Sequence, residues 1–275
     1  MTLPFHPLTV QWFSDRLGIP TDVQARAWPI LATGGHVLVT APTGTGKTLA
    51  AFLGAIDRLL TGAWPGEGLK VLYVSPLKAL NNDIRRNLLV PLAELYDRFA
   101  AAELCPPKIE VMVRSGDTPE DERRRLRRRP PEILITTPES LNILLTQKGS
   151  GTLFGGLRVV ILDEIHAVIG SKRGTALLTA LERLVPLAGE FQRIGLSATV
   201  NPPDLVARAL GGFRPDGDPR AVALVASRTA KAYEVKVVLA DIKPDSDNGK
   251  AWLKGYEEGE KLPQKFPPKP RGLDN

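Results

Sequence analysis

Short apolar runs alternate with longer segments of helical spacing along most of this 275-residue chain. Runs of β-branched residues and leucine predict buried strands at 37–40, 70–75, 109–113, 132–136, 158–163 and 193–196. Apolar residues three or four positions apart predict helices at 48–60, 77–99, 119–127, 138–147, 174–186 and 202–210. This alternation favours an α/β fold, a mostly parallel sheet with helices on both faces and ligand sites beyond the carboxyl ends of the strands.

The residue composition of the sequence changes near Asp241. A strand-like run at 233–240 is followed by residues rich in proline, glycine and charge. We therefore expect one domain over residues 1–240 and a poorly ordered tail or linker over 241–275. A short packed helix around Trp252 is the alternative for part of that tail.

The chain is basic, with 36 Lys and Arg against 30 Asp and Glu and a formal net charge of +6. Such a balance favours a polyanionic partner, because basic surfaces concentrate phosphates and release counterions on binding. The densest charge is the run 123–129, in which six arginines surround Leu126. Two interpretations stay open for this run, a solvated helix face and a patch that follows a phosphate backbone.

Cysteine content and hydropathy limit the remaining classes of protein. Cys105 is the only cysteine, so an intrachain disulfide and two-cysteine zinc or redox motifs are excluded. The chain shows no basic-then-apolar leader and no apolar run near the roughly 18 residues that a membrane helix needs. We expect a cytoplasmic protein with no membrane partner.

A glycine-rich loop follows the first predicted strand. The run Ala41-Pro42-Thr43-Gly44-Thr45-Gly46-Lys47-Thr48 lies between that strand and a helix. Glycines let successive backbone amides and the helix N-terminus face phosphate oxygens, Lys47 reaches the β and γ phosphates, and the Thr48 hydroxyl can bind Mg²⁺. A chance glycine-rich turn would require strand, loop, Lys-Thr pair and helix to coincide, so we expect an ATP site formed by Thr43, Gly44, Thr45, Gly46, Lys47 and Thr48.

Two carboxylates end the predicted strand at 158–163. The apolar residues 159–162 lead into Asp163-Glu164-Ile165-His166. Carboxylates there suit Mg²⁺ bound to ATP: Asp163 would hold the metal and Glu164 would orient and deprotonate the attacking water. The alternatives are a helix N-cap for the two acids and a solvated loop histidine for His166. With the glycine-rich loop upstream, nucleotide hydrolysis is the favoured interpretation, with Lys47, Asp163 and Glu164 as its catalytic residues.

Further motifs follow these two in a fixed order: Pro20 to Gln24, Ser75-Pro76-Leu77-Lys78-Ala79-Leu80, Arg114 to Thr118, Thr136 to Ser140 and Gly195-Leu196-Ser197-Ala198-Thr199. With them the sequence resembles the superfamily 2 DEAD/DEAH-like helicases, and within these the large helicase-related (Lhr) group, over roughly residues 5–240. The resemblance implies a RecA-like phosphate-loop NTPase domain, the first of the two domains in such a motor.

The resemblance also implies roles for individual residues. Gln24 would recognise adenine, and His166, Ser197, Ala198 and Thr199 would couple hydrolysis to strand movement. Pro76, Leu77, Lys78, Arg114, Gly116, Thr137, Pro138, Glu139 and Ser140 would lie along single-stranded or partly duplex DNA or RNA. The turn before the helix that starts at Pro138 supports backbone contacts, since it exposes amides and hydroxyls. ATP and Mg²⁺ are the implied cofactors, and the resemblance associates the chain with DNA repair.

The sequence departs from the family pattern in two places. Ala41 stands where the general phosphate-loop pattern has glycine, and the 76 residues after Thr199 contain no Gln-x-x-Gly-Arg-x-Gly-Arg motif. That motif brings arginines to the γ-phosphate from a second motor domain, and an arginine finger can be worth about 10³ to 10⁵ in rate. We therefore expect the truncated, ATP-binding half of an ATP-dependent helicase, which alone is a severely impaired ATPase and cannot unwind a duplex. A second motor domain supplied in trans is the expected partner. The alternatives are a non-catalytic, nucleotide-gated nucleic-acid-binding module and an unrelated phosphate-loop ATPase.

Overall fold

The computed structural model describes residues 3–76 and 84–227. Several predictions lie outside these residues: the contacts of Leu77 and Lys78, the strand-like run at 233–240 and the tail from residue 241. No helix in the two described ranges is both long and apolar enough to cross a bilayer.

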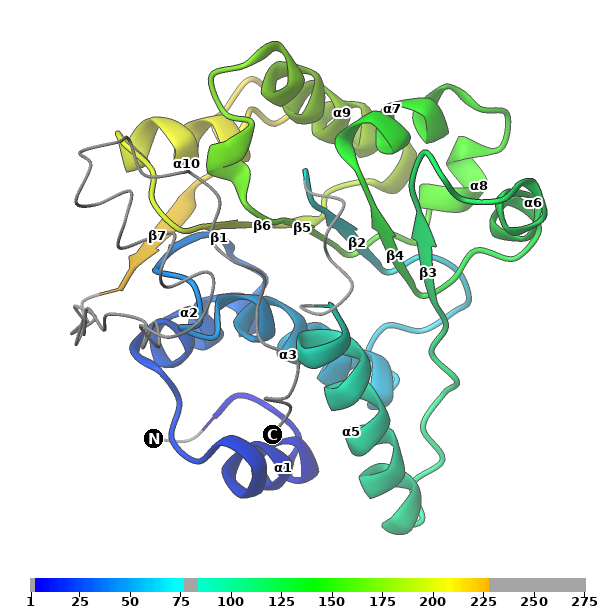
Figure 1. Cartoon of the computed structure of the whole chain (residues 1–275), viewed down its shortest axis with the longest axis vertical. Coiled ribbons are helices and arrows are strands. Elements are labelled where there is room, and N and C mark those ends of the chain that lie inside the picture. Colours follow the sequence, from blue (N-terminus) through cyan, green and yellow to red (C-terminus); the bar gives the residue numbers. More distant parts are fainter. Residues whose placement is uncertain (1–2, 77–83, 228–275) are drawn as a thin grey trace, which may run out of the picture. The chain divides into compact units, whose positions relative to one another are not determined.

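The centre of the fold is a seven-stranded sheet in the order β3-β4-β2-β5-β6-β1-β7 (Figure 1). Every pair of neighbouring strands is parallel. The strands are β1 (His36–Thr40), β2 (Val71–Val74), β3 (Val111–Arg114), β4 (Ile133–Thr136), β5 (Val159–Leu162), β6 (Gln192–Ser197) and β7 (Val222–Ala226). The sheet confirms the predicted α/β class, and the six predicted strands are all present with ends shifted by only one or two residues.

Strand composition explains why the sheet is covered on both faces. All residues of β2, β4, β5 and β6 are buried. Continuous Val, Ile and Leu runs of this kind belong to parallel strands between two helical layers. The register pairs Val74 with Leu162 and Thr40 with Ser197, so the carboxyl ends of neighbouring strands lie together at one edge of the sheet.

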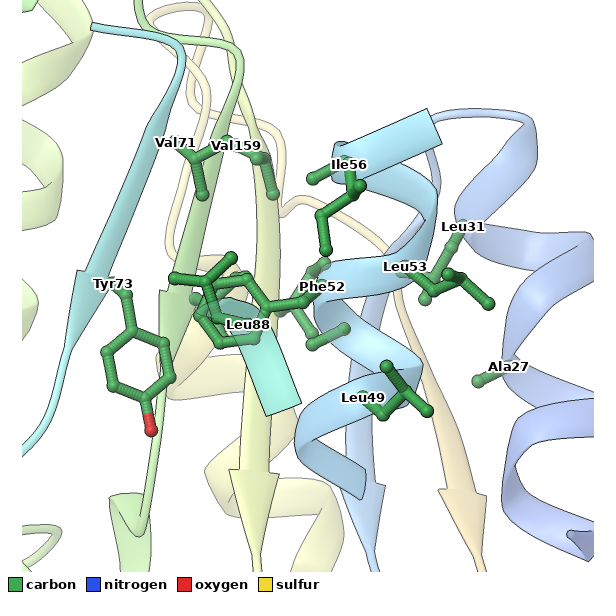
Figure 2. Packing of buried hydrophobic residues seen from close by; sticks show 14 of the residues in the cluster. Ala27, Leu31, Leu49, Phe52, Leu53, Ile56, Val71, Tyr73, Leu88 and Val159 are labelled. Carbon is green, nitrogen blue, oxygen red and sulfur yellow. The ribbon is translucent and has the colours of Figure 1, made fainter. Parts of the chain in front are cut away.

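One face of the sheet is covered by helices from the first part of the chain (Figure 1). They are α1 (Pro7–Leu17), α2 (Asp22–Ala32), α3 (Lys47–Leu60), the π-helix η1 (Arg85–Leu89) and α5 (Val90–Ala101). Figure 2 shows α3 at the centre of this layer, with Phe52 beside Tyr73 of β2. The two rings are stacked with their centroids 5.1 Å apart, and Leu88 belongs to the same hydrophobic cluster.

The opposite face is covered by α6 (Glu120–Arg128), α7 (Pro138–Thr146), α8 (Ser150–Phe154), α9 (Lys172–Ala188) and α10 (Pro203–Gly211). Their leucines pack on the other side chains of the same strands, among them Leu72, Leu134 and Val160. Because strand side chains alternate, β1, β2, β4 and β5 each contribute to both clusters.

The structure contains elements that the apolar patterns did not predict. Helices α1 and α2, the short α8 and the edge strand β7 are additional. The predicted helix at 77–99 is described only from residue 84, where η1 precedes α5. Pro91 is the second residue of α5, which follows the π-helical turn directly.

Candidate active site

The glycine-rich loop joins the carboxyl end of β1 to the N-terminus of α3. Gly44 and Gly46 have φ angles of 78° and 81°, in the left-handed region that side chains disfavour. An added Cβ at Gly46 would also lie 2.5 Å from Nε2 of Gln24, so the end of that side chain would have to move. The loop therefore favours glycine at this position, mainly for its backbone conformation.

Lys47 is the first residue of α3, and its side chain folds back into the loop. Its Nζ donates hydrogen bonds to the carbonyl oxygens of Ala41 and Pro42, the second at 3.0 Å, and only 5% of the residue is exposed. A buried ammonium group at a helix N-terminus favours an anionic ligand there. Thr48 follows it in the first turn of the same helix.

Gln24 connects α2 to the glycine-rich loop. It forms a capping box with Thr21. The Thr21 hydroxyl accepts a hydrogen bond from the backbone N–H of Gln24, and the side-chain Oε1 of Gln24 accepts one from the backbone N–H of Thr21 at 3.0 Å. Its Nε2 donates to the carbonyl oxygen of Gly46 at 3.3 Å. Both ends of the Gln24 amide group thus contact the protein, so an adenine base that bonds to this amide would exchange with one of these contacts.

Asp163 and Glu164 follow β5 and face the glycine-rich loop across β6. Asp163 is 8% exposed, and one of its carboxylate oxygens accepts a hydrogen bond from the hydroxyl of Tyr73. Its other oxygen accepts from the Glu164 amide at 2.9 Å. Glu164 itself has a φ of 47°, a conformation that costs a non-glycine residue free energy and is concentrated at functional sites.

His166 connects the end of β5 to the end of β6. Its Nδ1 lies 2.9 Å from Oγ of Ser197 and 3.2 Å from Oε2 of Glu164. Ser197 is fully buried and donates its single hydrogen to the Thr199 carbonyl at 3.2 Å. With the Ser197 hydroxyl donating to the Thr199 carbonyl, Oγ of Ser197 accepts from Nδ1, which places the hydrogen of the His166 ring on Nδ1 in this arrangement. Ser197 therefore links the predicted coupling residues His166 and Thr199.

A cavity of about 640 Å³ brings the predicted nucleotide site together. This volume is within the range of roughly 300–1,000 Å³ for small-molecule sites. Its lining includes Gln24, Thr43, Gly44, Gly46, Lys47, Thr48, Asp163 and Glu164. Thr45 is not part of the lining; its hydroxyl donates to the Pro42 carbonyl at 2.7 Å and closes the turn.

The predicted nucleic-acid segments lie at the same edge of the sheet, at the ends of β2, β3 and β4. Thr137 caps α7, its hydroxyl accepting from the amide of the buried Ser140 at 3.3 Å. Glu139 forms an ion pair with Arg173 of α9, with Nη2 and Oε2 at 3.1 Å. The same Nη2 donates to the Pro76 carbonyl at 3.0 Å, so Arg173 joins two of the predicted segments.

Arg114 and Gly116, two predicted nucleic-acid residues, form hydrogen bonds within the loop that follows β3. Arg114 is 3% exposed and donates to the adjacent Ser115 carbonyl; burial and the nearby Arg123 lower the pKa of its guanidinium. In this conformation the buried Arg114 side chain is not available to contact a nucleic-acid strand. Arg123 donates to the carbonyls of Gly116 and Thr118, at 2.8 and 2.7 Å, and holds the loop after β3.

The rest of the arginine run lies on α6 and is mostly exposed. Arg125 and Arg127 form ion pairs with Glu110 and Glu120. The run is therefore a solvated helix face that is partly neutralised within the protein, while Arg128 at its end forms no hydrogen bond or ion pair with another described residue. A contact between this face and a phosphate backbone stays a prediction.

Two residues at this edge were not predicted from the sequence. Tyr73 lies inside an apolar strand and gave no functional signal, because its contact with Asp163 follows from strand pairing. Arg173 comes ten residues after Asp163, and its contacts with Pro76 and Glu139 depend on the packing of α7 against α9.

The family model described as DEAD/DEAH box helicase matches residues 21–206. The chain is 48% identical over 252 residues to the Lhr helicase/probable uracil glycosylase of Mycolicibacterium smegmatis, covering 90% of this chain and 16% of that protein. It is 46% identical to ATP-dependent helicase Lhr-Core protein 2 of Thermococcus barophilus, covering 82% of this chain and 27% of that protein. The chain thus spans well under a third of the length of these curated relatives.

Among solved structures, the Mycobacterium smegmatis helicase Lhr bound to ssDNA and AMP-PNP superposes with a TM-score of 0.76. That comparison has 47% identity and covers 85% of this chain and 29% of the other. The fold is therefore the RecA-like helicase domain that the sequence motifs predicted.

Proposed function

Because this chain belongs to the DEAD/DEAH box helicase family and is an Lhr-type helicase ATPase domain, we propose that it binds ATP with Mg²⁺ and hydrolyses it in a motor that moves on single-stranded nucleic acid. The observation that carries this proposal is the 640 Å³ cavity. It places the glycine-rich loop opposite Asp163 and Glu164, at the carboxyl edge of the sheet.

The residues present fit a triphosphate and a divalent cation. Gly46 holds the loop in a left-handed backbone conformation, and Lys47 is already held inside the loop by two carbonyl oxygens. We propose that Lys47 exchanges these carbonyls for phosphate oxygens when ATP binds. Thr48 and Asp163 offer the oxygen ligands that Mg²⁺ prefers, and this cation usually takes its remaining ligands from phosphates and water. Bound Mg²⁺ would offset the negative charge of the phosphates.

Glu164 is the residue that we assign as general base. Its backbone conformation directs it away from the regular course of the strand, and its carboxylate lies beside His166. We propose that Glu164 accepts a proton from the attacking water, while Asp163 and Lys47 keep the phosphates in place. His166 then senses the protonation of Glu164 and passes the change to Ser197, 2.9 Å away.

Nucleic acid is proposed to lie along the ends of β2, β3 and β4. The M. smegmatis Lhr structure contains ssDNA, which supports single-stranded nucleic acid as the ligand class. Helix N-termini and exposed backbone amides bind sugar-phosphate without reading bases, so we expect weak dependence on base sequence. Arg173 holds this surface in shape through Pro76 and Glu139.

An experiment in two stages tests the proposed function. ATP turnover is first measured for the 275-residue polypeptide with and without single-stranded DNA, and then with the second motor domain of a relative supplied in trans or by fusion. We expect a rate increase of orders of magnitude in the second stage, as an arginine finger can add about 10³ to 10⁵. Glu164→Gln should abolish the gain while ATP stays bound, and robust DNA-stimulated turnover by the polypeptide alone would contradict the dependence on a second domain.

A non-catalytic, nucleotide-gated binding module is the second candidate. It is favoured by the hydrogen bonds that Gln24 and Lys47 donate to carbonyl oxygens of the glycine-rich loop. ATP would replace these hydrogen bonds and so change the conformation of the loop. In this case ATP would alter the affinity for single-stranded nucleic acid, and added second domain would leave turnover unchanged.

A further inference from the structure

A second cavity, of about 540 Å³, lies at the edge of the sheet opposite the nucleotide site. It is formed at the amino ends of β1, β5 and β6, next to the last turns of α2 and α3. Its lining is Ala32, Thr33, Gly34, His36, Arg58, Trp64, Arg158, Glu190, Phe191, Gln192 and Arg214. None of the predicted nucleotide or nucleic-acid residues is among them.

The lining of this cavity carries an excess of positive charge. Arg58, Arg158 and Arg214 face a single acid, Glu190. That acid is already bound on both oxygens by Arg220, at 2.7 and 2.8 Å, and the Arg220 hydrogen bond lowers the pKa of the Glu190 carboxyl. Glu190 therefore offers the three arginines little compensation.

Arg58 is fixed in place before any ligand binds. Its Nη2 donates to the carbonyl oxygens of Ala32 and Leu31, at 2.6 and 3.3 Å, which tie the end of α3 to the end of α2. The guanidinium also lies 5.5 Å from the centre of the Trp64 ring. A preorganised guanidinium loses little conformational entropy when it binds an anion.

Arg158 and Arg214 are exposed, and neither side chain forms a hydrogen bond or an ion pair with another residue in the described ranges. The charge of Arg158 affects the pKa of a neighbouring group. Arg158 contributes, after burial, to the lowered pKa of Lys70. Burial, followed by the charges of Arg193 and Arg220, lowers the pKa of His36, another residue of the lining.

We propose that this cavity is a second anion site, which binds a phosphate-bearing ligand through Arg158 and Arg214, with Arg58 and Trp64 as its fixed wall. Guanidinium groups are the side chains best suited to phosphate, because their paired N–H donors match its oxygens. The volume accommodates a phosphate ester of the size of a nucleotide. Free phosphate compounds and the backbone of a nucleic acid share this chemistry, and the experiment separates them.

The site differs in kind from the glycine-rich loop. There, phosphate recognition rests on backbone amides, a helix N-terminus and one lysine, whereas the second cavity relies on side-chain guanidiniums at the opposite edge of the sheet. Charge reversal at its two exposed arginines should therefore leave the fold and the nucleotide site intact.

Tryptophan indole N–H signals in nuclear magnetic resonance spectra report the two cavities separately. Trp64 lines the second cavity and Trp12 lines the first, and each signal can be assigned with a Trp→Phe variant. The full 275-residue chain is titrated with inorganic pyrophosphate at constant ionic strength, and in parallel with a single-stranded oligonucleotide. We expect a saturable shift of the Trp64 signal in at least one titration.

The double variant Arg158→Glu/Arg214→Glu should weaken the affinity reported by the Trp64 signal at least about tenfold, since two charge-assisted hydrogen-bond donors are replaced by negative charges. Its Trp12 signal should respond to ATP as in the parent chain, which shows that the variant is folded. The control Arg124→Glu/Arg128→Glu, on the exposed face of α6, should keep the response to pyrophosphate.

A response to pyrophosphate alone assigns the site to free phosphate compounds, and a response to the oligonucleotide assigns it to a nucleic-acid backbone. The proposal is overturned if the Trp64 signal shows no saturable shift with either probe, or if the double variant binds as tightly as the parent chain.

Discussion

The hydroxyl of Tyr73 donates a hydrogen bond to the carboxylate of Asp163 and so joins the ends of β2 and β5 inside the candidate site. The ring of Tyr73 stacks on Phe52, and in Figure 2 its hydroxyl oxygen points toward the carboxyl ends of the strands. Tyr73 is fully buried, and its donor fixes the orientation of the side chain that we assign to Mg²⁺. It is a positioning residue, because it acts through Asp163.

Tyr73→Phe should raise the Mg²⁺ concentration that supports half-maximal ATP binding. Loss of one hydrogen bond to a charged group is worth roughly 1.5–3 kcal/mol, so we expect about a tenfold shift or more. The ring and its packing on Phe52 remain, which keeps the fold intact. The measurement is calorimetric ATP binding across a Mg²⁺ series, with Tyr96→Phe on α5 as the matched control. An unchanged Mg²⁺ dependence would remove the positioning role.

Ser197→Ala should separate ATP binding from its coupling to nucleic acid. His166 Nδ1 loses its acceptor at 2.9 Å, while Lys47, Thr48 and Asp163 are untouched. We expect ATP affinity to change by less than about fivefold, the equivalent of a neutral hydrogen bond of about 1 kcal/mol. The stimulation of turnover by single-stranded DNA, measured with the second motor domain present, should fall much further. Equal stimulation in parent and variant would contradict the coupling role.

Arg173→Ala should weaken single-stranded nucleic-acid binding without changing its salt dependence. Log K should fall with log salt at about −0.7 per phosphate contacted in both proteins, because the charge of Arg173 is already paired with Glu139. The affinity itself should drop about threefold to tenfold, since the hydrogen bond to the Pro76 carbonyl is lost. Fluorescence anisotropy at several salt concentrations measures both quantities. A parent-like affinity would show that Arg173 does not shape this surface.

The ion pair of Arg173 and Glu139 also predicts a pH dependence of stability. The Arg173 hydrogen bond lowers the pKa of Glu139 below its ordinary value of 4.5. A lowered folded-state pKa adds stability that is fully present above the unfolded pKa and is lost as pH falls through the folded pKa. The pair is exposed, so Glu139→Gln, which leaves the hydrogen bond from Arg173 to the Pro76 carbonyl in place, should cost at most about 1 kcal/mol at pH 7. Denaturant unfolding should show this difference shrinking as the pH falls below 4.5 and through the lowered pKa of Glu139, and a difference that persists in strong acid would exclude the pair as its cause.

The sequence predicted most of the sheet, and its motifs named residues that line the candidate cavity, for identifiable reasons. Continuous Val, Ile and Leu runs are unambiguous when both faces are buried, as in β5. Glycine-rich loops and paired carboxylates carry their chemistry in consecutive residues, so Lys47 and Asp163 were found directly. The capping box of Thr21 and Gln24 was also present in the sequence, although it was interpreted only as an adenine-recognition element.

Other features depend on tertiary contacts that consecutive residues do not encode. The contact of Tyr73 with Asp163 requires the pairing of β2 with β5, ninety positions apart. The burial of Arg114 requires the loop that Arg123 folds around it. The second cavity combines residues from α2, α3, β1, β6 and five loops, and its arginines have no motif in common.

The central claim is that the cavity beside the glycine-rich loop binds ATP, and titration calorimetry of Mg²⁺–ATP into the parent chain and into Lys47→Ala tests it most directly. We predict saturable binding by the parent chain, weaker binding of GTP, and at least about tenfold weaker ATP binding by Lys47→Ala, because a buried charge-assisted contact to phosphate is lost. The matched control is Lys148→Ala at an exposed site beyond α7. Equal ATP affinity in the parent chain and Lys47→Ala would contradict the assignment of the site.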